Sequence, residues 1–348
     1  MTRDRGGKVT LKHIAQRVGV SAMTVSRALS GKEALVDPRT ARRIRDVAAE
    51  MGYTPNLLAR SLRGERLPTI VVFAEQISRH IYLAELMDHV ARAIEERDYG
   101  MIACQSPQSL RAALTQFNLA GAVVLAPPES LFYDEQGRPF QHLRVEEPLV
   151  VIHCAVEQRF FTEVSPDLAD AARQAAEHLL QLGHRRIAFL GGPSIEMERT
   201  WVRTRQSGIE RAFKPFGLDD SALRYQPCDG PEEAAEALKS LLRTDPRVTG
   251  VICLNDEIAV AAIHGARELG REVPRDLSVI GSNDTRMAWY FRPALTTIRI
   301  DVPALVEKGL SLLFEEIGDS RPDSNGRRRL PHLEKCELIV RASTAPPA

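Results

Sequence analysis

Beyond residue 67 the chain alternates apolar, β-rich runs with helical stretches, and this alternation limits the possible folds more than any other feature. The runs are TIVVFA, GAVVLAP, LVVIH, RIAFLGG, VTGVICL and LSVIG. Helical patterns over 82–97, 168–182, 231–243 and 256–269 lie between them. Buried strands that alternate with helices predict parallel sheets with crossover helices. The runs are too many for one such sheet, so we predict two similar α/β lobes.

A ligand site is expected between these lobes, because ligands of such sheets bind beyond the carboxyl ends of the strands. The loops at those ends follow Ala74, Pro127, His153, Gly191, Leu254 and Gly281. We therefore expect these loops to line a cleft.

Charge is distributed unevenly along the chain, although the formal net charge is zero. Residues 1–66 hold 14 Lys and Arg against 6 Asp and Glu, whereas the remainder holds 32 against 40. A small basic segment joined to a larger acidic body indicates that only the first segment binds a polyanion. Nucleic acid is the leading candidate.

This basic segment carries the pattern of a helix-turn-helix. Thr10 precedes the helical run 11–18, and Gly19 can take the left-handed conformation that ends a helix. Ser21 is a second N-cap before the run 22–29, so two short helices flank a tight turn at Gly19 and Val20. An ordinary helical hairpin is the alternative, and the basic excess argues against it.

The second helix of this motif has an outer face that can enter a major groove. That face consists of Ala22, Met23, Ser26 and Arg27. Arg27 can form a bidentate hydrogen bond with guanine. The face is therefore predicted to contact base edges.

A third helix is predicted over 38–51, and a shorter helical segment over 56–62 follows it. Two turns are too few to persist alone in water, so the second segment should fold only when it is held. Small Ala59 and apolar Leu62 share one face of this segment, between Arg60 and Arg63 around the helix. They could enter a minor groove and wedge open a base step.

The predicted fold is thus a small all-α helix-turn-helix headpiece followed by an α/β body of two lobes with parallel sheets. The headpiece is placed at 8–54, a hinge helix and linker at 55–67, and the body at 68–348. The first lobe is assigned to about 68–155 and 299–320, and the second to about 156–298 and 333–345.

Several other classes of protein are disfavoured by the sequence. The N-terminus has no signal peptide, no segment is apolar enough to span a membrane, and the five cysteines form no C-x-x-C pair, so we expect a cytoplasmic protein with buried thiols. No G-x-S-x-G elbow, G-x-x-x-x-G-K loop or H-E-x-x-H motif occurs. The Gly-Gly-Pro turn at 191–193 lacks the third glycine of a dinucleotide site. We therefore predict no enzyme activity, no metal and no cofactor.

Nearly the whole chain resembles the LacI/GalR family of repressors. The headpiece and hinge carry the resemblance in VTLKHIAQRVGVSAMTVSRALSG, VDPRTARRI and MGYTPNLLARSLRG. It continues in DLADAARQAAEHLLQLGHRRIAFLGGP, GVICLNDEIAVAA, VPRDLSVIGSNDT and PALTTI. The lobes accordingly look like type 1 periplasmic sugar-binding proteins.

The resemblance implies roles for individual residues of the headpiece and hinge. Ala22, Met23 and Arg27 match base-reading positions, Ser21 and Thr24 match phosphate contacts, and Asn56 and Ala59 match hinge contacts. Leu62 matches the leucine that intercalates between base pairs. The full DNA-binding set that we predict is Thr10, Ser21, Ala22, Met23, Thr24, Ser26, Arg27, Tyr53, Asn56, Ala59 and Leu62.

The chain also departs from the family pattern. His13 stands where the family often has Asp, and residues 129–147 do not follow the pattern. His153 and Asn283 occupy strand ends at which sugar-binding members commonly place a carboxylate, whereas Arg205 is retained. A less negative cleft favours a sugar acid or sugar phosphate over a neutral sugar, with nucleobases as a further alternative.

The predicted effector site combines polar groups with aromatic stacking faces. It consists of Tyr82, His153, Arg205, Asn255, Asn283 and Trp289. Arg205 could instead form a structural ion pair at the interface of the lobes.

We therefore predict a transcriptional repressor whose operator affinity is controlled by a small molecule bound between the lobes. Its partners are a pseudo-palindromic double-stranded operator, the effector and a second copy of the chain, since one short recognition helix makes too few base contacts. It should associate with the nucleoid when it is bound to the operator. The alternative is a soluble cytoplasmic small-molecule-binding protein with only non-specific DNA affinity.

Overall fold

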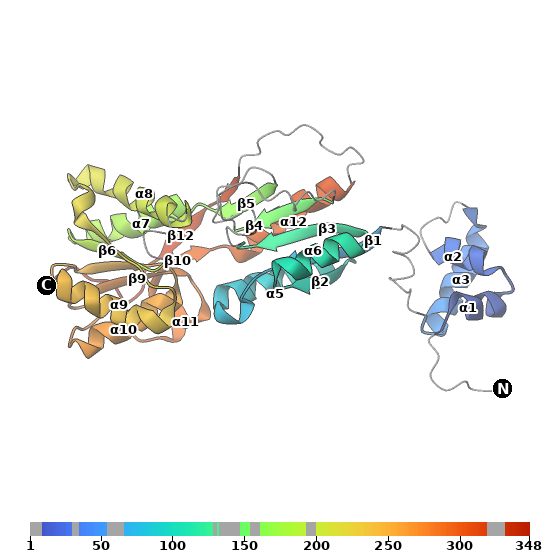
Figure 1. Ribbon diagram of the computed structural model, residues 1–348, viewed down its shortest axis with the longest axis horizontal. Coiled ribbons are helices and arrows are strands. Elements are labelled where there is room, and N and C mark those ends of the chain that lie inside the picture. The colour runs from blue at the N-terminus through green and yellow to red at the C-terminus, as the bar shows by residue number, and fades with distance from the viewer. Residues whose placement is uncertain are drawn as a thin grey trace. The chain divides into compact units, whose positions relative to one another are not determined.

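The computed structural model describes residues 9–29, 35–53, 66–127, 131, 147–153, 161–192, 200–318 and 331–348. The chain divides into two compact units, Met1–Leu67 and Pro68–Ala348 (Figure 1). The first unit is the headpiece, and the second is the body.

The headpiece is built from short helices packed on one small core. The helices are α1 (Leu11–Val18), α2 (Ala22–Leu29) and α3 (Pro38–Glu50). Each places small or branched apolar side chains inward, and the fully buried members include Ile14, Val25 and Ile44. The predicted all-α headpiece is confirmed.

The body contains two six-stranded sheets, one in each lobe. The order in the first lobe is β11-β5-β4-β3-β1-β2. Its strands are β1 (Leu67–Phe73), β2 (Gly100–Cys104), β3 (Leu119–Leu125), β4 (Leu149–Ile152), β5 (Thr162–Pro166) and β11 (His332–Glu334).

The sheet of the second lobe repeats this arrangement in the order β12-β10-β9-β8-β6-β7. Its strands are β6 (Ile187–Leu190), β7 (Leu223–Gln226), β8 (Gly250–Cys253), β9 (Ser278–Asn283), β10 (Thr296–Ile300) and β12 (Cys336–Ile339). Only β12 pairs antiparallel with its neighbour among the paired strands described. The predicted pair of similar parallel lobes is therefore confirmed.

Helices cover the sheets of both lobes. Those of the first lobe are α5 (Ile81–Glu95), α6 (Pro107–Gln116) and α12 (Val302–Gly318). Those of the second lobe are α7 (Leu168–Gln181), α8 (Thr200–Phe213), α9 (Pro231–Thr244), α10 (Asp256–Glu268) and the short α11 (Arg286–Tyr290). The pair α7 and α8 covers one face of the second sheet, and the pair α9 and α10 covers the other (Figure 1).

Sheet topology determines where a ligand can bind. In each lobe the second strand of the chain lies at one edge, and the strand order reverses between β1 and β3 and between β6 and β8. Crevices for ligands form beyond the carboxyl ends of strands at such switch points. His153 and Asn283 stand at the carboxyl ends of the next strands along, following β4 and ending β9.

The chain crosses between the lobes at positions that partly differ from those predicted. β5 (Thr162–Pro166) belongs to the first sheet, so the first crossing follows Pro166 and the boundary predicted near residue 155 is wrong. β5 lacks the apolar run of a typical buried strand, although all of its residues are buried. The last crossing separates β11 from β12 at Lys335, so residues 333 and 334 also belong to the first lobe.

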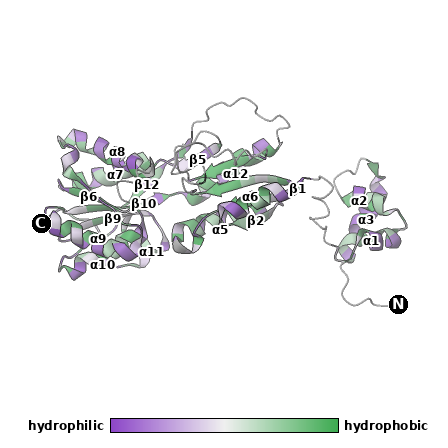
Figure 2. Ribbon diagram, in the orientation of Figure 1, coloured by the Kyte–Doolittle hydropathy of each residue, from purple (hydrophilic) through white to green (hydrophobic). Residues whose placement is uncertain are grey.

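The sheets form the apolar interior of both lobes, as the hydropathy colouring of the strands shows (Figure 2). Cys104, Cys228, Cys253 and Cys336 are buried free thiols, as predicted, and Cys154 lies outside the described residues. Within the described ranges, no helix is both long and apolar enough to cross a membrane.

Candidate functional site

The turn between α1 and α2 has the geometry that the sequence predicts. Gly19 has φ of 80°, and its N–H donates to the Ala15 carbonyl at 2.9 Å. A left-handed residue at this position favours glycine. The Ser21 hydroxyl oxygen accepts the Thr24 N–H at 3.1 Å, which caps α2. The helix-turn-helix is thus shaped by local hydrogen bonds.

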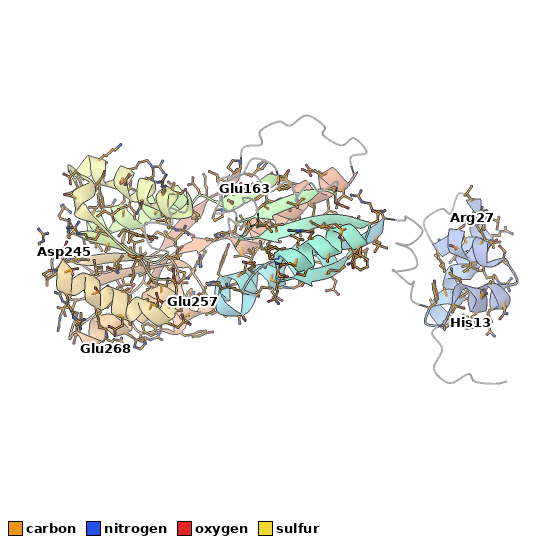
Figure 3. The ribbon with its side chains drawn as sticks, viewed as in Figure 1. His13, Arg27, Glu163, Asp245, Glu257 and Glu268 are labelled. Carbon is orange, nitrogen blue, oxygen red and sulfur yellow. The ribbon has the colours of Figure 1, made fainter. Side chains whose placement is uncertain are left out.

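The outer face of α2 presents side chains to solvent. Met23 is 63% exposed although it is apolar. Arg27, labelled in Figure 3, is also exposed. Ser26 is half-buried, and Ala22 is half-buried and packs partly on the headpiece core. An exposed methionine beside an arginine on a short helix is consistent with a face that contacts another molecule.

Ser21 and Thr24 have hydroxyls that are 2.9 Å apart and bond to each other. Ser21 therefore caps α2, and Thr24 holds the Ser21 hydroxyl in place. The phosphate contacts that the resemblance implies for both residues stay a prediction.

His13, at a position where the family often has Asp, forms a cap at the start of α1. Its Nδ1 accepts the N–H of Thr10 at 3.3 Å, so the side chain reaches back to the start of α1. A reciprocal contact of this kind satisfies one of the amide groups at a helix N-terminus. The substitution noted in the sequence therefore preserves a cap.

The end of the headpiece is defined by α3 and Tyr53. Asp37 accepts from the N–H groups of Arg39 and Thr40 at 3.1 Å, a cap that the sequence analysis missed. Tyr53 is half-buried and packs against the headpiece core. The predicted hinge residues Asn56, Ala59 and Leu62 lie outside the described residues.

In the body, left-handed backbone is concentrated at the carboxyl ends of the strands. Ala126 follows β3 with φ of 39°, His153 follows β4 with φ of 58°, and Asn283 ends β9 with φ of 101°. Conformations of this kind are costly for residues other than glycine, and they cluster at binding sites. This backbone geometry supports the ligand site predicted from the strand ends.

Tyr82, His153 and Arg205 meet at the junction of the lobes. The Tyr82 hydroxyl and His153 Nδ1 are 2.8 Å apart, and both residues belong to the first lobe. Arg205 comes from α8 of the second lobe, and its charge acts on both of them. Residues separated by more than a hundred positions therefore form one polar cluster.

The protonation states of this cluster follow from its burial. Burial, together with a smaller contribution from the charge of Arg205, lowers the pKa of His153 to about 3. Burial likewise raises the pKa of Tyr82 and lowers the pKa of Arg205 to about 10. At neutral pH the cluster contains a cation, a neutral imidazole and a protonated phenol.

Asn255 and Asn283 carry the next polar groups at the strand ends. The Asn255 side-chain oxygen accepts the Ile258 N–H at 2.8 Å and caps α10. Because the oxygen is used in this cap, the amide NH₂ is the donor group of the Asn255 side chain. Both asparagines are half-buried.

Trp289 has a different environment from the stacking face that was predicted. The Arg341 guanidinium lies 4.4 Å from the centre of its ring, and the tryptophan is 57% exposed. Arg341 in turn donates to Asp284 Oδ1 at 2.5 Å. One face of the indole is therefore covered by a cation that is anchored to the end of β9.

Asp284 and Asp256 have buried carboxyl groups, and neither residue is in the predicted effector-binding set. Asp284 is bound by Arg341 and by Arg299 at 2.8 Å. Asp256 accepts from the Thr297 hydroxyl at 2.6 Å and from Thr285 N–H at 2.7 Å, and burial raises its pKa to about 7. Both carboxyl groups hold the strand ends in place: Asp284 is paired with two arginines, whereas Asp256 is held by hydrogen bonds alone.

Gly281 is the small residue that allows Asp256 this close approach. A Cβ at Gly281 would collide with the Asp256 carboxyl and with Leu295.

A small cavity nearby extends under α7, is lined mainly by apolar groups, and is bordered by Gly281, Cys253 and Arg205. Over the described ranges, no group of three or more His, Cys, Asp or Glu side chains could hold a metal ion.

Comparison with known families gives two adjacent matches. Residues 10–56 match the bacterial regulatory proteins, lacI family, and residues 161–344 match the periplasmic binding protein-like domain. The HTH-type transcriptional repressor PurR of Pectobacterium atrosepticum is 31% identical over 327 residues, covering 91% of this chain and 92% of that protein. The chain belongs to the lacI family. As a lacI-family protein it is a DNA-binding transcriptional repressor.

Solved structures of lacI-family regulators share the fold. A regulator from Enterococcus faecium with bound ribose is 26% identical, with a TM-score of 0.67 over 80% of this chain and 99% of that one. The lac repressor dimer bound to operator and the anti-inducer ONPF has a TM-score of 0.78 at 21% identity, covering 97% and 100%. The CelR–cellobiose complex has a TM-score of 0.67 at 24% identity, covering 97% and 100%.

Proposed function

We propose that this lacI-family repressor loses or gains operator affinity when a small molecule binds at the junction of its two lobes. The observation that carries the proposal is the cluster of Tyr82, His153 and Arg205, which takes residues from both lobes. A ligand bound there contacts both lobes at once and can therefore change their relative arrangement. Effector and operator are then thermodynamically linked, whichever sign the coupling has.

For operator binding, two headpieces act together in a homodimer. Each places the exposed face of α2, with Met23 and Arg27, in the major groove of one half-site of a pseudo-palindrome. Support comes from the lac repressor neighbour, which is a dimer bound to operator. The hinge residues Asn56, Ala59 and Leu62 complete operator binding through the minor groove, with Leu62 as the wedge at the operator centre.

The effector that fits best is an anionic sugar derivative, a sugar acid or a sugar phosphate. Arg205 supplies a buried cation, His153 is neutral, and Asp284 is already bound by two arginines. An arginine fork binds a carboxylate or phosphate in two-point geometry. Neighbouring structures hold ribose and cellobiose, both neutral sugars, so a neutral sugar is the competing class.

A thermal-shift screen separates these classes, because a ligand that binds only the native state raises the melting temperature. Gluconate, glucose 6-phosphate, ribose, cellobiose and adenine are tested on the full chain, and each stabilising compound is then titrated against operator binding. We expect stabilisation by an anionic compound together with a change in operator affinity. Stabilisation by neutral sugars alone overturns the anionic effector.

The operator titration also tests the alternative of a small-molecule-binding protein with only non-specific DNA affinity. A repressor should bind one selected sequence about a thousandfold or more tighter than random DNA at the same salt concentration. Equal affinity for selected and random duplexes would favour the alternative. The proposed place of action is the cytoplasm, with the protein at the nucleoid when it is bound to operator.

A further inference from the structure

The helix α5 begins at the junction of the lobes without a cap from its own segment. His80 is its N-cap residue, but the His80 side chain makes no capping hydrogen bond, and the first turn holds no acidic residue. Other helices are capped locally, as α7 is by Asp167 and α10 by Asn255. The first N–H groups of a helix have no acceptor within the helix, so α5 needs one from elsewhere.

A residue of the other lobe supplies that acceptor. Glu257 Oε1, on α10 of the second lobe, accepts the Ile81 N–H at 3.4 Å. Figure 3 shows Glu257 at the part of α10 that faces α5. A carboxylate is also favourable there because the N-terminus of a helix carries partial positive charge. Glu257 thus fills the place of both a cap and a first-turn acid.

The groups around Glu257 are consistent with a functional contact. Glu257 is half-buried, and this burial raises the pKa of its carboxyl. His80 acts on it with the opposite sign, and Glu232 on α9 repels it. A half-buried carboxylate loses part of its hydration, and the hydrogen bond from Ile81 offsets this cost.

The capped end of α5 also carries an effector-site residue. Tyr82 directly follows Ile81, and its hydroxyl bonds to His153 at 2.8 Å. A shift of the first turn of α5 therefore moves Tyr82 relative to Arg205. The hydrogen bond between Ile81 and Glu257 and the polar cluster are two contacts across the same junction.

We propose that Glu257 is an interlobe latch, a positioning residue that caps α5 from the second lobe and favours the arrangement in which the lobes are in contact. It sets the fraction of protein molecules in which the effector site is assembled before any effector binds. Only its effect on effector affinity rests on the function proposed above. The latch itself is a property of the fold.

The latch has a measurable energetic consequence. A net hydrogen bond of this kind changes an equilibrium by roughly three- to tenfold, and the apparent Kd of a ligand rises as the competent fraction falls. Glu257→Ala should therefore weaken effector binding by roughly three- to tenfold. Glu257→Gln keeps an acceptor oxygen and should restore most of the affinity.

Amide hydrogen exchange on the full chain tests the latch without effector or DNA. Because the Ile81 N–H has no acceptor within α5, its protection reports the contact with Glu257 directly. We expect the first turn of α5 to exchange roughly tenfold faster in Glu257→Ala and close to the wild-type rate in Glu257→Gln. Glu232→Ala is the matched control, since it removes a neighbouring negative charge and leaves the latch.

The outcomes separate the latch from the proposed function. Faster exchange confined to the start of α5 in Glu257→Ala, with the middle of α10 unchanged, supports the latch even if gluconate and glucose 6-phosphate both fail to bind. Unchanged exchange at Ile81 in Glu257→Ala overturns it, as does an equal increase in Glu232→Ala. Where a ligand from the screen binds, an unchanged Kd in Glu257→Ala contradicts the role of the latch in effector affinity.

Discussion

The two binding regions of this repressor are built in opposite ways. In the headpiece, the candidate readers Met23 and Arg27 are exposed on one short helix, and the core beneath them only fixes that helix. In the body, Tyr82, His153 and Arg205 come from three distant segments, and Tyr82 and Arg205 are buried. The candidate site of the headpiece is therefore a surface, whereas the candidate site of the body consists of polar groups largely removed from water.

This difference implies that substitutions should act differently in the two regions. An exposed reader can be removed with little effect on folding. A buried polar group affects ligand binding, protonation and stability together, because its neighbours are arranged around it.

The largest effect is expected at Arg205. Arg205→Gln should weaken binding of an anionic effector by about a hundredfold or more, near 3 kcal/mol, because a buried charge-assisted contact is lost. Isothermal titration with the anionic compound identified by thermal shift measures this loss. Arg203→Gln, at an exposed position of the same helix, is the control. An intact Kd in Arg205→Gln would assign Arg205 to a structural ion pair.

A smaller loss, restricted to one base pair, is expected at Arg27. Arg27→Ala should reduce discrimination at a single guanine of each half-site by about 2 kcal/mol, and the protein should still fold because Arg27 is exposed. Binding to a panel of operator variants measures it. Arg17→Ala, at the exposed end of α1, should leave base preference unchanged. A uniform loss over all sequences in Arg27→Ala would indicate a phosphate contact instead.

The loss of hydration at the imidazole of His153 should make the body sensitive to acid. Its pKa is lowered from 6.5 to about 3, so the unfolded chain takes up a proton that the native state refuses. The stabilising contribution is present above pH 6.5 and is lost as pH falls below it, by about 1 kcal/mol at pH 5.5. Denaturant unfolding at pH 7.5 and pH 5.5 measures the change.

His153→Asn is the variant that isolates this contribution. Asparagine tolerates the left-handed backbone at this position and offers an acceptor to Tyr82. The variant should lose part of the acid sensitivity, and the remainder belongs to His178 and His184, whose pKa values burial also lowers. An unaltered pH dependence in His153→Asn would place the imidazole in water.

The smallest effect is expected from the capping serine of α2. Ser21→Ala should destabilise the headpiece by about 0.5 to 1 kcal/mol, because the Thr24 N–H loses its acceptor. Hydrogen exchange at the start of α2 in the absence of DNA measures this loss. Ser26→Ala, a half-buried position within α2, is the matched control. Equal exchange in the two variants would leave Ser21 with the phosphate contact alone.

The interior of the body shows why some strands were predicted and others were missed. The strands β3 and β8 are apolar and fully buried, so their runs stand out in the sequence. β5 is buried as well, but it contains Thr162, Glu163 and Ser165. The Thr162 hydroxyl donates to Glu316 at 2.5 Å, and the Ser165 hydroxyl donates to Glu163 at 2.8 Å. Hydrogen bonds to residues placed by the fold make this polar strand tolerable in the interior.

The amino-acid sequence by itself determined the helix-turn-helix, the two α/β lobes and the set of strand ends that bear polar residues. Caps, left-handed glycines and apolar runs depend on a few neighbouring residues, so they can be recognised in the sequence alone. The tertiary structure decided three contacts: the hydrogen bond between Tyr82 and His153, the ion pair of Asp284 with Arg341, and the cap that Glu257 gives to α5. Each joins residues from distant segments, and a hydrogen bond or a pKa shift depends on distance and burial in space, which sequence separation does not encode.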